Sequence, residues 1–170
     1  MIELNTERLR IIPLNSDNMK LLIESQNQME KNLALRETAE FVDPELKPAL
    51  EIRLSKLLND QKKYIWHTNW AIVLKEINTY VGGIMIKGLP NENGEVVIGY
   101  YTIPRYQGNG YMTETVENIK RWLLNQPNVR TVIADTEKDN IASHRVLEKT
   151  GAIKYKETEE LYSWKFSQKN

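Results

Sequence analysis

The sequence contains no cysteine in its 170 residues. A disulfide scaffold, a thiolate zinc site and a cysteine nucleophile are therefore excluded, and we predict no bound metal. An excess of one charge is also missing, because 23 lysines and arginines balance 23 aspartates and glutamates. A general nucleic-acid binder usually carries a surplus of basic residues, so the sequence disfavours that class of protein.

Long apolar runs are absent as well. No stretch approaches the ~18 residues that a membrane span needs, and the first ten residues, MIELNTERLR, carry charges where a signal peptide needs an apolar core. We therefore expect a cytoplasmic protein with no membrane partner. The length suits one ordinary domain. No repeat or low-complexity linker divides it, so we expect a single domain over residues 1–170.

Hydrophobic periodicity and turn residues predict a mixture of strands and helices. Strands are expected at residues 9–14, 70–75, 80–86, 95–103, 130–136, 152–157 and 161–166, and helices at 15–26, 45–61, 112–123 and 140–151. The early strands are joined by turns and the later ones through helices, so part of the sheet should be parallel. The sequence therefore predicts an α+β (mixed α/β) domain around one sheet.

The segment RYQGNGYM, residues 105–112, joins an expected strand to an expected helix. The first amides of a helix lack internal partners, and the helix dipole there favours anions. Gly108 and Gly110 allow a ligand to approach the backbone closely, so a phosphate or pyrophosphate is the expected occupant. A Walker loop would need Gly-Lys-Ser/Thr, and a dinucleotide fingerprint would need glycine where Thr113 stands. A plain strand-to-helix turn is the alternative.

Three motifs carry a resemblance to a known family. RYQGNG has the Arg/Gln-x-x-Gly-x-Gly/Ala pattern of the GNAT superfamily of N-acetyltransferases, and IGYYTIPRYQGNGYMTETV resembles its RimJ/RimL-like branch, named for ribosomal-protein N-terminal acetyltransferases. TERL at 6–9 and DNIASHRVLEKTGA at 139–152 are similar to two further segments of that branch. The resemblance implies a GNAT-like domain with a mostly antiparallel central sheet, splayed in the middle and flanked by about four helices.

The resemblance also implies acetyl-CoA as the cosubstrate. Its pyrophosphate would bind backbone amides of residues 107–112, and its pantetheine arm would follow residues 101–103 and meet Asn140, which serves equally well as a helix N-cap. The residues expected to contact acetyl-CoA are Tyr101, Thr102, Ile103, Gln107, Gly108, Asn109, Gly110, Tyr111, Met112, Asn140 and Ser143.

Acetyl transfer sets three chemical requirements, for which Tyr101, Ser143 and Glu95 are the catalytic candidates. A free backbone N–H near Tyr101 or Thr102 could stabilise the tetrahedral oxyanion. The resemblance implies that Ser143 contacts the departing CoA sulfur, because Leu147 stands where many other members carry a tyrosine. Glu95 is a candidate base, although the branch often carries an acidic residue two positions later, where this chain has a valine.

The acceptor amine must be neutral to attack. An α-amino group with a pKa near 8 is about 10% neutral at pH 7, whereas a lysine is less than about 0.1% neutral. The resemblance implies an acetyl-CoA-dependent N-acetyltransferase that acetylates a primary amine, on a protein N-terminus or a small molecule, by direct attack in a ternary complex. A catalytically silent acyl-CoA-binding sensor or interaction module is the alternative. The sequence leaves a monomer and a homodimer equally open.

Overall fold

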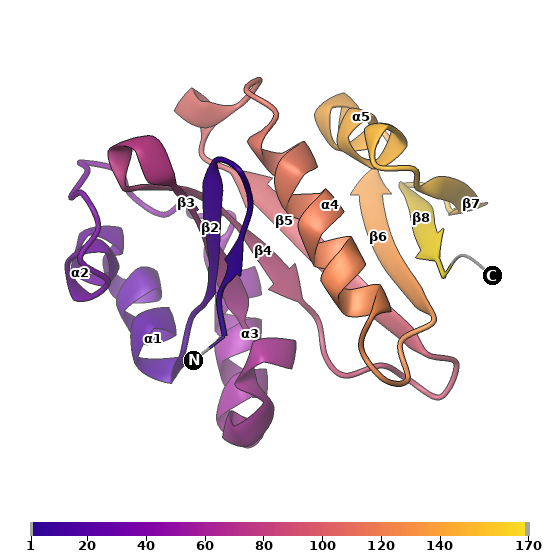
Figure 1. Cartoon of the computed structure of the whole chain (residues 1–170), viewed down its shortest axis with the longest axis horizontal. Coiled ribbons are helices and arrows are strands. Elements are labelled where there is room, and N and C mark those ends of the chain that lie inside the picture. Colours follow the sequence, from indigo (N-terminus) through magenta and orange to yellow (C-terminus); the bar gives the residue numbers. More distant parts are fainter. Residues whose placement is uncertain (1, 169–170) are drawn as a thin grey trace.

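The strands form one continuous sheet in the computed structural model, which describes residues 2–168 (Figure 1). The described strands are β1 (Leu4–Asn5), β2 (Leu9–Pro13), β3 (Asn69–Leu74), β4 (Thr79–Ile86), β5 (Glu95–Thr102), β6 (Thr131–Glu137), β7 (Ile153–Glu157) and β8 (Leu161–Ser167). Their spatial order is β1-β2-β3-β4-β5-β6-β8-β7. β5 and β6 pair parallel, and every other neighbouring pair is antiparallel. The predicted mixed fold, with a partly parallel sheet, is confirmed.

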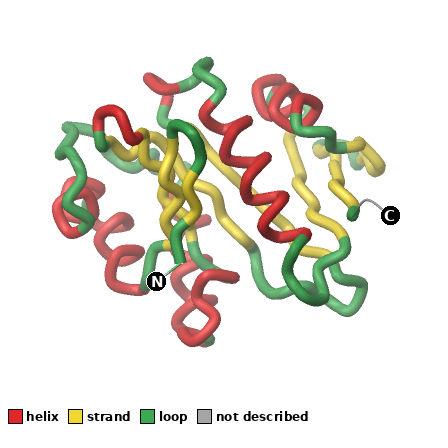
Figure 2. The backbone as a smooth tube through the Cα atoms, in the orientation of Figure 1, coloured by secondary structure: helices red, strands yellow, loops and turns green. Residues whose placement is uncertain are grey.

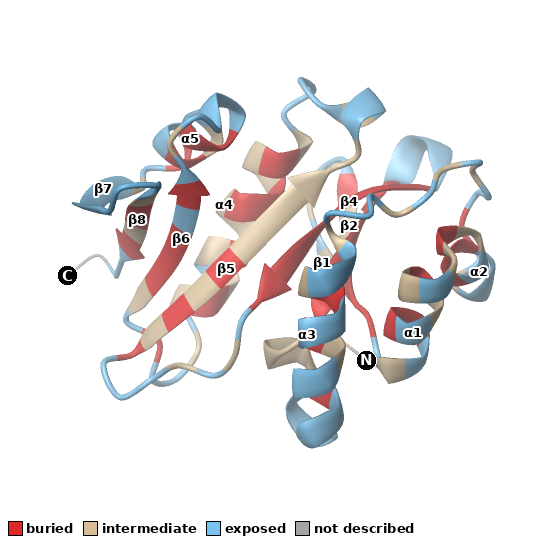
Figure 3. Cartoon of the chain, turned by 180° about the vertical axis from the view of Figure 1, so that it is seen from behind, coloured by how far each residue is buried: buried red, intermediate tan, exposed pale blue. Residues whose placement is uncertain are grey.

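Helices cover the two faces of this sheet unequally. α1 (Ser16–Glu24), α2 (Gln26–Asn32) and α3 (Lys47–Asn59) pack on one face, and α4 (Tyr111–Leu124) and α5 (Ile141–Lys149) pack on the other. Short 3-10 turns complete the described helices: η1 (Gln61–Trp66), η2 (Lys75–Ile77) and η3 (Pro104–Tyr106). Viewed from behind, β5, β6, β8 and β7 carry no helix on the side where α1–α3 lie (Figure 3).

Two hydrophobic clusters follow from strand alternation, since successive side chains point to opposite faces of a sheet. On β3, Trp70 and Ile72 pack into the cluster beneath α4 and α5, whereas Ala71 and Val73 pack into the cluster beneath α1–α3. All six residues of β3 are buried. The central strands are therefore fixed from both sides, which gives the site a rigid support.

Sequence analysis missed one α-helix, α2. Its sequence, QNQMEKN, offers a single apolar residue, Met29, so no hydrophobic stripe marks it. Tertiary contacts stabilise it instead: Met29 and Glu30 are fully buried, and the Glu30 carboxylate accepts hydrogen bonds from the backbone and side chain of Thr38 at 3.0 and 2.9 Å. The described residues thus contain five α-helices, where the sequence suggested about four.

The sheet opens between its two parallel strands. β5 and β6 are paired from Glu95↔Thr131 to Ile98↔Ala134 and no further. Beyond that point β5 stays paired with β4, up to Thr102, and β6 stays paired with β8. A register shift between β3 and β4 marks a bulge in β4 just where it supports the free part of β5, and such bulges bend a strand and increase its twist. The expected splay in the middle of the sheet is confirmed.

Two adjacent glycines in β4 allow β5 to lie close against it. A Cβ at Gly82 would collide with the backbone of Tyr101. A Cβ at Gly83 would lie 2.5 Å from the Tyr101 hydroxyl and would also collide with the Asn69 side chain. The phenol of Tyr101 therefore occupies the space that a side chain at Gly83 would need.

We expect Gly83→Ala to destabilise the fold by about 1–3 kcal/mol, because a methyl group added to a packed core forces its neighbours to shift. Gly99→Ala is the matched control: it is also a strand glycine, but its added Cβ would meet only the flexible end of Lys87, at 3.1 Å. The control should change the free energy of unfolding by less than about 1 kcal/mol. Urea denaturation of both variants tests this, and equal stabilities would contradict it.

Candidate active site

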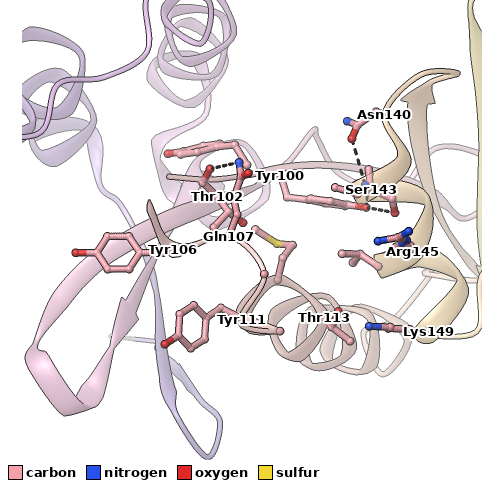
Figure 4. Close-up of a pocket in the computed structure, with 16 residues that line it drawn as sticks. Tyr100, Thr102, Tyr106, Gln107, Tyr111, Thr113, Asn140, Ser143, Arg145 and Lys149 are labelled. Atoms are coloured by element: carbon pink, nitrogen blue, oxygen red, sulfur yellow. Dashed lines mark hydrogen bonds between the residues drawn. The ribbon is translucent and has the colours of Figure 1, made fainter. Parts of the chain in front are cut away.

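A cavity of about 540 Å³ lies where the free part of β5 faces the start of α4 and the first turns of α5 (Figure 4). Its lining is formed by Tyr100, Tyr101, Thr102, Tyr106, Gln107, Gly108, Gly110, Tyr111, Met112, Thr113, Asn140, Ala142, Ser143, Arg145, Val146 and Lys149. The opening of the sheet therefore leads directly into the glycine loop that the sequence singled out.

The loop presents a row of free backbone amides. Figure 2 shows it as the short connection from β5 through η3 to α4. Gly108 and Gly110 have φ angles of +80° and +79°, a conformation that favours glycine. The Gln107 amide is bonded to the Pro104 carbonyl at 3.2 Å. The amides of residues 108–113 have no acceptor among residues 2–168, so an anion could accept hydrogen bonds from them.

The free edge of β5 offers a second set of backbone groups. The Ile103 amide donates to the Val81 carbonyl at 2.9 Å, toward β4. Because successive residues of a strand direct their N–H and C=O groups to opposite edges, Tyr101 also faces β4, whereas Tyr100 and Thr102 face the opening. The Gln107 side chain donates to the Thr102 carbonyl at 3.2 Å and ties the loop to this edge. The amides of Tyr100 and Thr102 are thus the ones that could reach a ligand.

Two hydroxyl groups meet inside the cavity. Asn140 caps α5, its side-chain oxygen accepting from the Ser143 amide at 3.2 Å. The Ser143 hydroxyl lies 2.7 Å from the Tyr100 hydroxyl, and either can donate (Figure 4). Burial raises the pKa of Tyr100 to about 12, although its hydrogen bond with Ser143 acts in the opposite direction. The phenol is therefore protonated, and able to donate, throughout the neutral range.

Tyr101 points to the opposite face of the sheet from Tyr100. Its hydroxyl accepts from the Asn69 side chain at 3.0 Å and is hydrogen-bonded to the Tyr80 hydroxyl. Burial raises the pKa of Tyr101 to about 12 and that of Tyr80 well above its ordinary value. The Tyr101 side chain thus anchors β5, and its amide faces β4 rather than the opening, so the amides of Tyr100 and Thr102 are the oxyanion candidates.

The expected site residues divide into two groups. The structure brings most of them to the cavity wall, but Ile103 and Asn109 are not part of it. Glu95 lies at the opposite end of β5, where its carboxylate accepts a hydrogen bond from Asn91 at 3.0 Å. Leu147 is fully buried in the core beneath α4 and α5. No carboxylate or imidazole lines the cavity within the part of the chain that the structure describes.

Sequence analysis missed seven residues of the cavity wall: Tyr100, Tyr106, Thr113, Ala142, Arg145, Val146 and Lys149. Tyr100 was not among the expected site residues, yet it alternates with Tyr101 along β5 and therefore faces the opening together with Thr102. Arg145 and Lys149 are four residues apart, a spacing that puts two side chains on one helix face, and both line the cavity. Their charges make this wall locally basic in a chain of zero net charge.

Comparison with known proteins identifies the family. Residues 8–153 match the acetyltransferase (GNAT) domain family, and the chain belongs to it. Over 166 residues, it is 28% identical to the uncharacterized N-acetyltransferase YjdG of Bacillus subtilis, covering 96% of this chain and 97% of that protein. The prediction of an acetyltransferase enzyme is thereby confirmed, and acetyl-CoA is the donor that this family uses.

Solved structures agree with the fold. The ribosomal-protein-S5-alanine acetyltransferase from Vibrio fischeri superimposes with a TM-score of 0.69 at 18% identity, covering 98% of this chain and 97% of that one. RimL, a ribosomal alpha-N-protein acetyltransferase in complex with coenzyme A, gives 0.64 at 14% identity, with 98% of each chain covered. At these identities the likeness shows the fold alone, so membership of the RimJ/RimL-like branch stays a prediction.

Within residues 2–168, no group of three or more His, Cys, Asp or Glu side chains is arranged to hold a metal ion. None of the helices in that range is long and apolar enough to cross a membrane.

Gly108→Glu should weaken coenzyme A binding by more than about tenfold, since it places a carboxylate beside the amides that would hold a phosphate. Gly151→Glu is the matched control. Like Gly108, Gly151 has a positive φ, +88°, and no atom lies within 4 Å of its added Cβ. Unlike Gly108, it does not line this cavity. Both variants share the strain of a positive φ, about 1–2 kcal/mol. Calorimetric titration measures the two affinities, and equal losses would exclude the loop as the phosphate site.

The buried tyrosines predict a loss of stability at high pH. Because the pKa values of Tyr80, Tyr100 and Tyr101 are raised in the folded state, their contribution is fully present below the unfolded pKa of about 10. It is lost as the pH rises from 10 toward 12. Melting temperatures between pH 8 and 11 should therefore fall above about pH 10. Tyr100→Phe, which removes one of these groups, should give a shallower fall; an identical profile would contradict the assignment.

Proposed function

We propose that the protein transfers acetyl from acetyl-CoA to a primary amine by direct attack in a ternary complex. The observation that carries this proposal is the cavity at the parting of β5 and β6, where free amides of the glycine loop, the free edge of β5 and the Ser143 hydroxyl converge. The pyrophosphate binds the amides of residues 108–113, and the pantetheine arm adds to the edge of β5. Arg145 and Lys149 lie on the same wall and supply positive charge for the phosphates.

The thioester carbonyl lies at the inner end of the opening, near Tyr100. Attack by the amine forms a C–N bond and a tetrahedral oxyanion, which the amide of Tyr100 or Thr102 stabilises. Collapse of this intermediate breaks the C–S bond. The thiolate takes up a proton through Ser143 and Tyr100. The proton that the acetylated amine loses passes through water to Tyr100, so both hydroxyl groups end the step protonated. A thiol has a pKa of about 8.5, so the departing sulfur needs only modest help.

The acceptor is best described as an α-amine. No carboxylate or imidazole lines the cavity in the described part of the chain, so an amine that is partly neutral without a base is favoured over a lysine. The two structural relatives described above are named as acetyltransferases of ribosomal proteins. This supports a peptide N-terminus ahead of a small molecule, and an enzyme of the RimJ/RimL-like branch.

Release of free thiol from acetyl-CoA tests the function and the acceptor together. Peptides with a free N-terminus should release thiol, whereas the same peptides with a blocked N-terminus and one lysine should not. Small amines such as amino acids and polyamines form the third arm. Coenzyme A binding without thiol release by any acceptor would instead indicate a silent acyl-CoA-binding module.

Ser143→Ala should lower kcat by about a hundredfold, the low end of the range for a proton donor, while coenzyme A affinity stays nearly unchanged. Tyr100→Phe should lower kcat in the same direction, because Ser143 then loses its hydrogen-bonding partner. Tyr80→Phe removes a buried tyrosine hydroxyl on the other face of the sheet. It controls for the loss of a hydroxyl that supports β5 without lining the cavity, so its kcat should fall less than that of Ser143→Ala. Normal kcat with a lowered melting temperature in Ser143→Ala would show that this hydroxyl supports the fold only.

A further inference from the structure

The segment TERL, residues 6–9, has no part in the proposed chemistry, yet it reaches the active site. It forms the turn between β1 and β2, and this turn lies beside the start of α4 (Figure 1). Thr6 shapes the turn: its amide donates to the Leu9 carbonyl at 2.9 Å, and its hydroxyl accepts from the Leu9 amide at 3.0 Å. The turn is therefore rigid where it meets α4.

Glu114, in the first turn of α4, joins this turn to the helix. Its carboxylate accepts the Thr6 hydroxyl, the Arg8 amide at 3.0 Å and the Arg8 Nε at 2.8 Å. Burial alone would raise the pKa of Glu114, but the hydrogen bonds from Thr6 and Arg8 outweigh it and the pKa is lowered. The carboxylate is thus charged at neutral pH. An isolated surface ion pair contributes little, but a carboxylate held by three donors forms a network.

Arg8 then extends from Glu114 to the glycine loop. Its Nη1 donates to the Asn109 carbonyl at 2.9 Å, and its guanidinium lies 4.7 Å from the centre of the Tyr111 ring. The Asn109 side chain donates back to the carbonyls of Tyr106 and Gln107 at 3.0 and 3.3 Å. The residue between the two glycines is therefore held through both its carbonyl and its side chain, although it does not line the cavity.

We propose that Arg8 is a positioning residue that holds the glycine loop in its anion-binding conformation, and that Glu114 and Thr6 in turn hold Arg8 in place. The proposal rests on the proposed function, because it assumes that acetyl-CoA binds this loop. A loop with two glycines loses much conformational freedom when it is ordered, and a loop ordered beforehand binds its ligand more tightly. Arg8 holds the Asn109 carbonyl, and it neutralises the Glu114 carboxylate, which would otherwise repel the phosphates.

Arg8→Ala is the first test. The Kd for coenzyme A and the KM for acetyl-CoA should rise about tenfold, the factor expected when one more residue must be ordered on binding. The kcat at saturating acetyl-CoA should stay within about twofold, because the chemistry is untouched. Arg10→Ala is the matched control: Arg10 lies in β2, directly after this turn, and pairs with Glu3. Its Kd and KM should match the wild type.

Two further variants distinguish a positioning role from a structural one. Arg8→Lys keeps the charge but cannot hold Glu114 and Asn109 with one planar fork, so its KM should also rise. The double variant Arg8→Ala/Glu114→Gln should bind coenzyme A only slightly more weakly than Arg8→Ala alone, because the two substitutions remove the same contacts. If Arg8→Ala fails to fold, the single variants Arg8→Lys and Glu114→Gln replace it. Each should raise the KM for acetyl-CoA, and an unchanged KM in both would overturn the proposal.

If Arg8→Ala lowers the melting temperature but leaves the Kd for coenzyme A and the KM for acetyl-CoA unchanged, the proposal is overturned. These residues would then stabilise the fold only. Failure of the wild-type protein to bind coenzyme A would be a separate result, which overturns the proposed function itself. The two failures are distinguishable, because only the second appears in the unsubstituted chain.

Discussion

The parting of β5 from β6 is the constraint on which the rest of the site depends. Paired strands satisfy each other's backbone groups, so a gap in a central sheet leaves amides and carbonyls that need another partner. Here the gap opens after Ile98 and Ala134, beneath α4 and α5. A linear ligand with its own amide groups can replace the missing strand, as in peptide recognition by strand addition. The pantetheine arm of acetyl-CoA is such a ligand.

Around this gap, one face of the sheet supports β5 and the other supplies the groups that line the cavity. On one face, Gly83, Asn69 and Tyr80 hold the Tyr101 ring, which fixes the unpaired half of β5 from behind. On the other face, α4 and α5 supply free amides, hydroxyl groups and the basic side chains Arg145 and Lys149. The protein has no net charge, but two of its basic side chains lie together on the cavity wall. This wall therefore favours an anion.

Sequence analysis predicted the parts of the molecule whose signals are local. Alternation and helical stripes located most strands and helices, and the glycine pair located the loop. α2 was missed because tertiary contacts of Glu30 and Met29, rather than a stripe, stabilise it. The meeting of Tyr100 with Ser143, 43 residues apart in the chain, and the distance of Glu95 from the cavity depend on how strands pair. No local pattern contains that information.

Amide chemical shifts recorded by NMR during titration with acetyl-CoA test the central claim most directly. If acetyl-CoA fills the gap in the sheet, the largest changes should fall on the amides of residues 108–113 and on those of Tyr100 and Thr102. The amide of Tyr101, which faces β4, should change less than its two neighbours. Saturable binding that leaves the glycine loop and the free edge of β5 unperturbed would contradict the account.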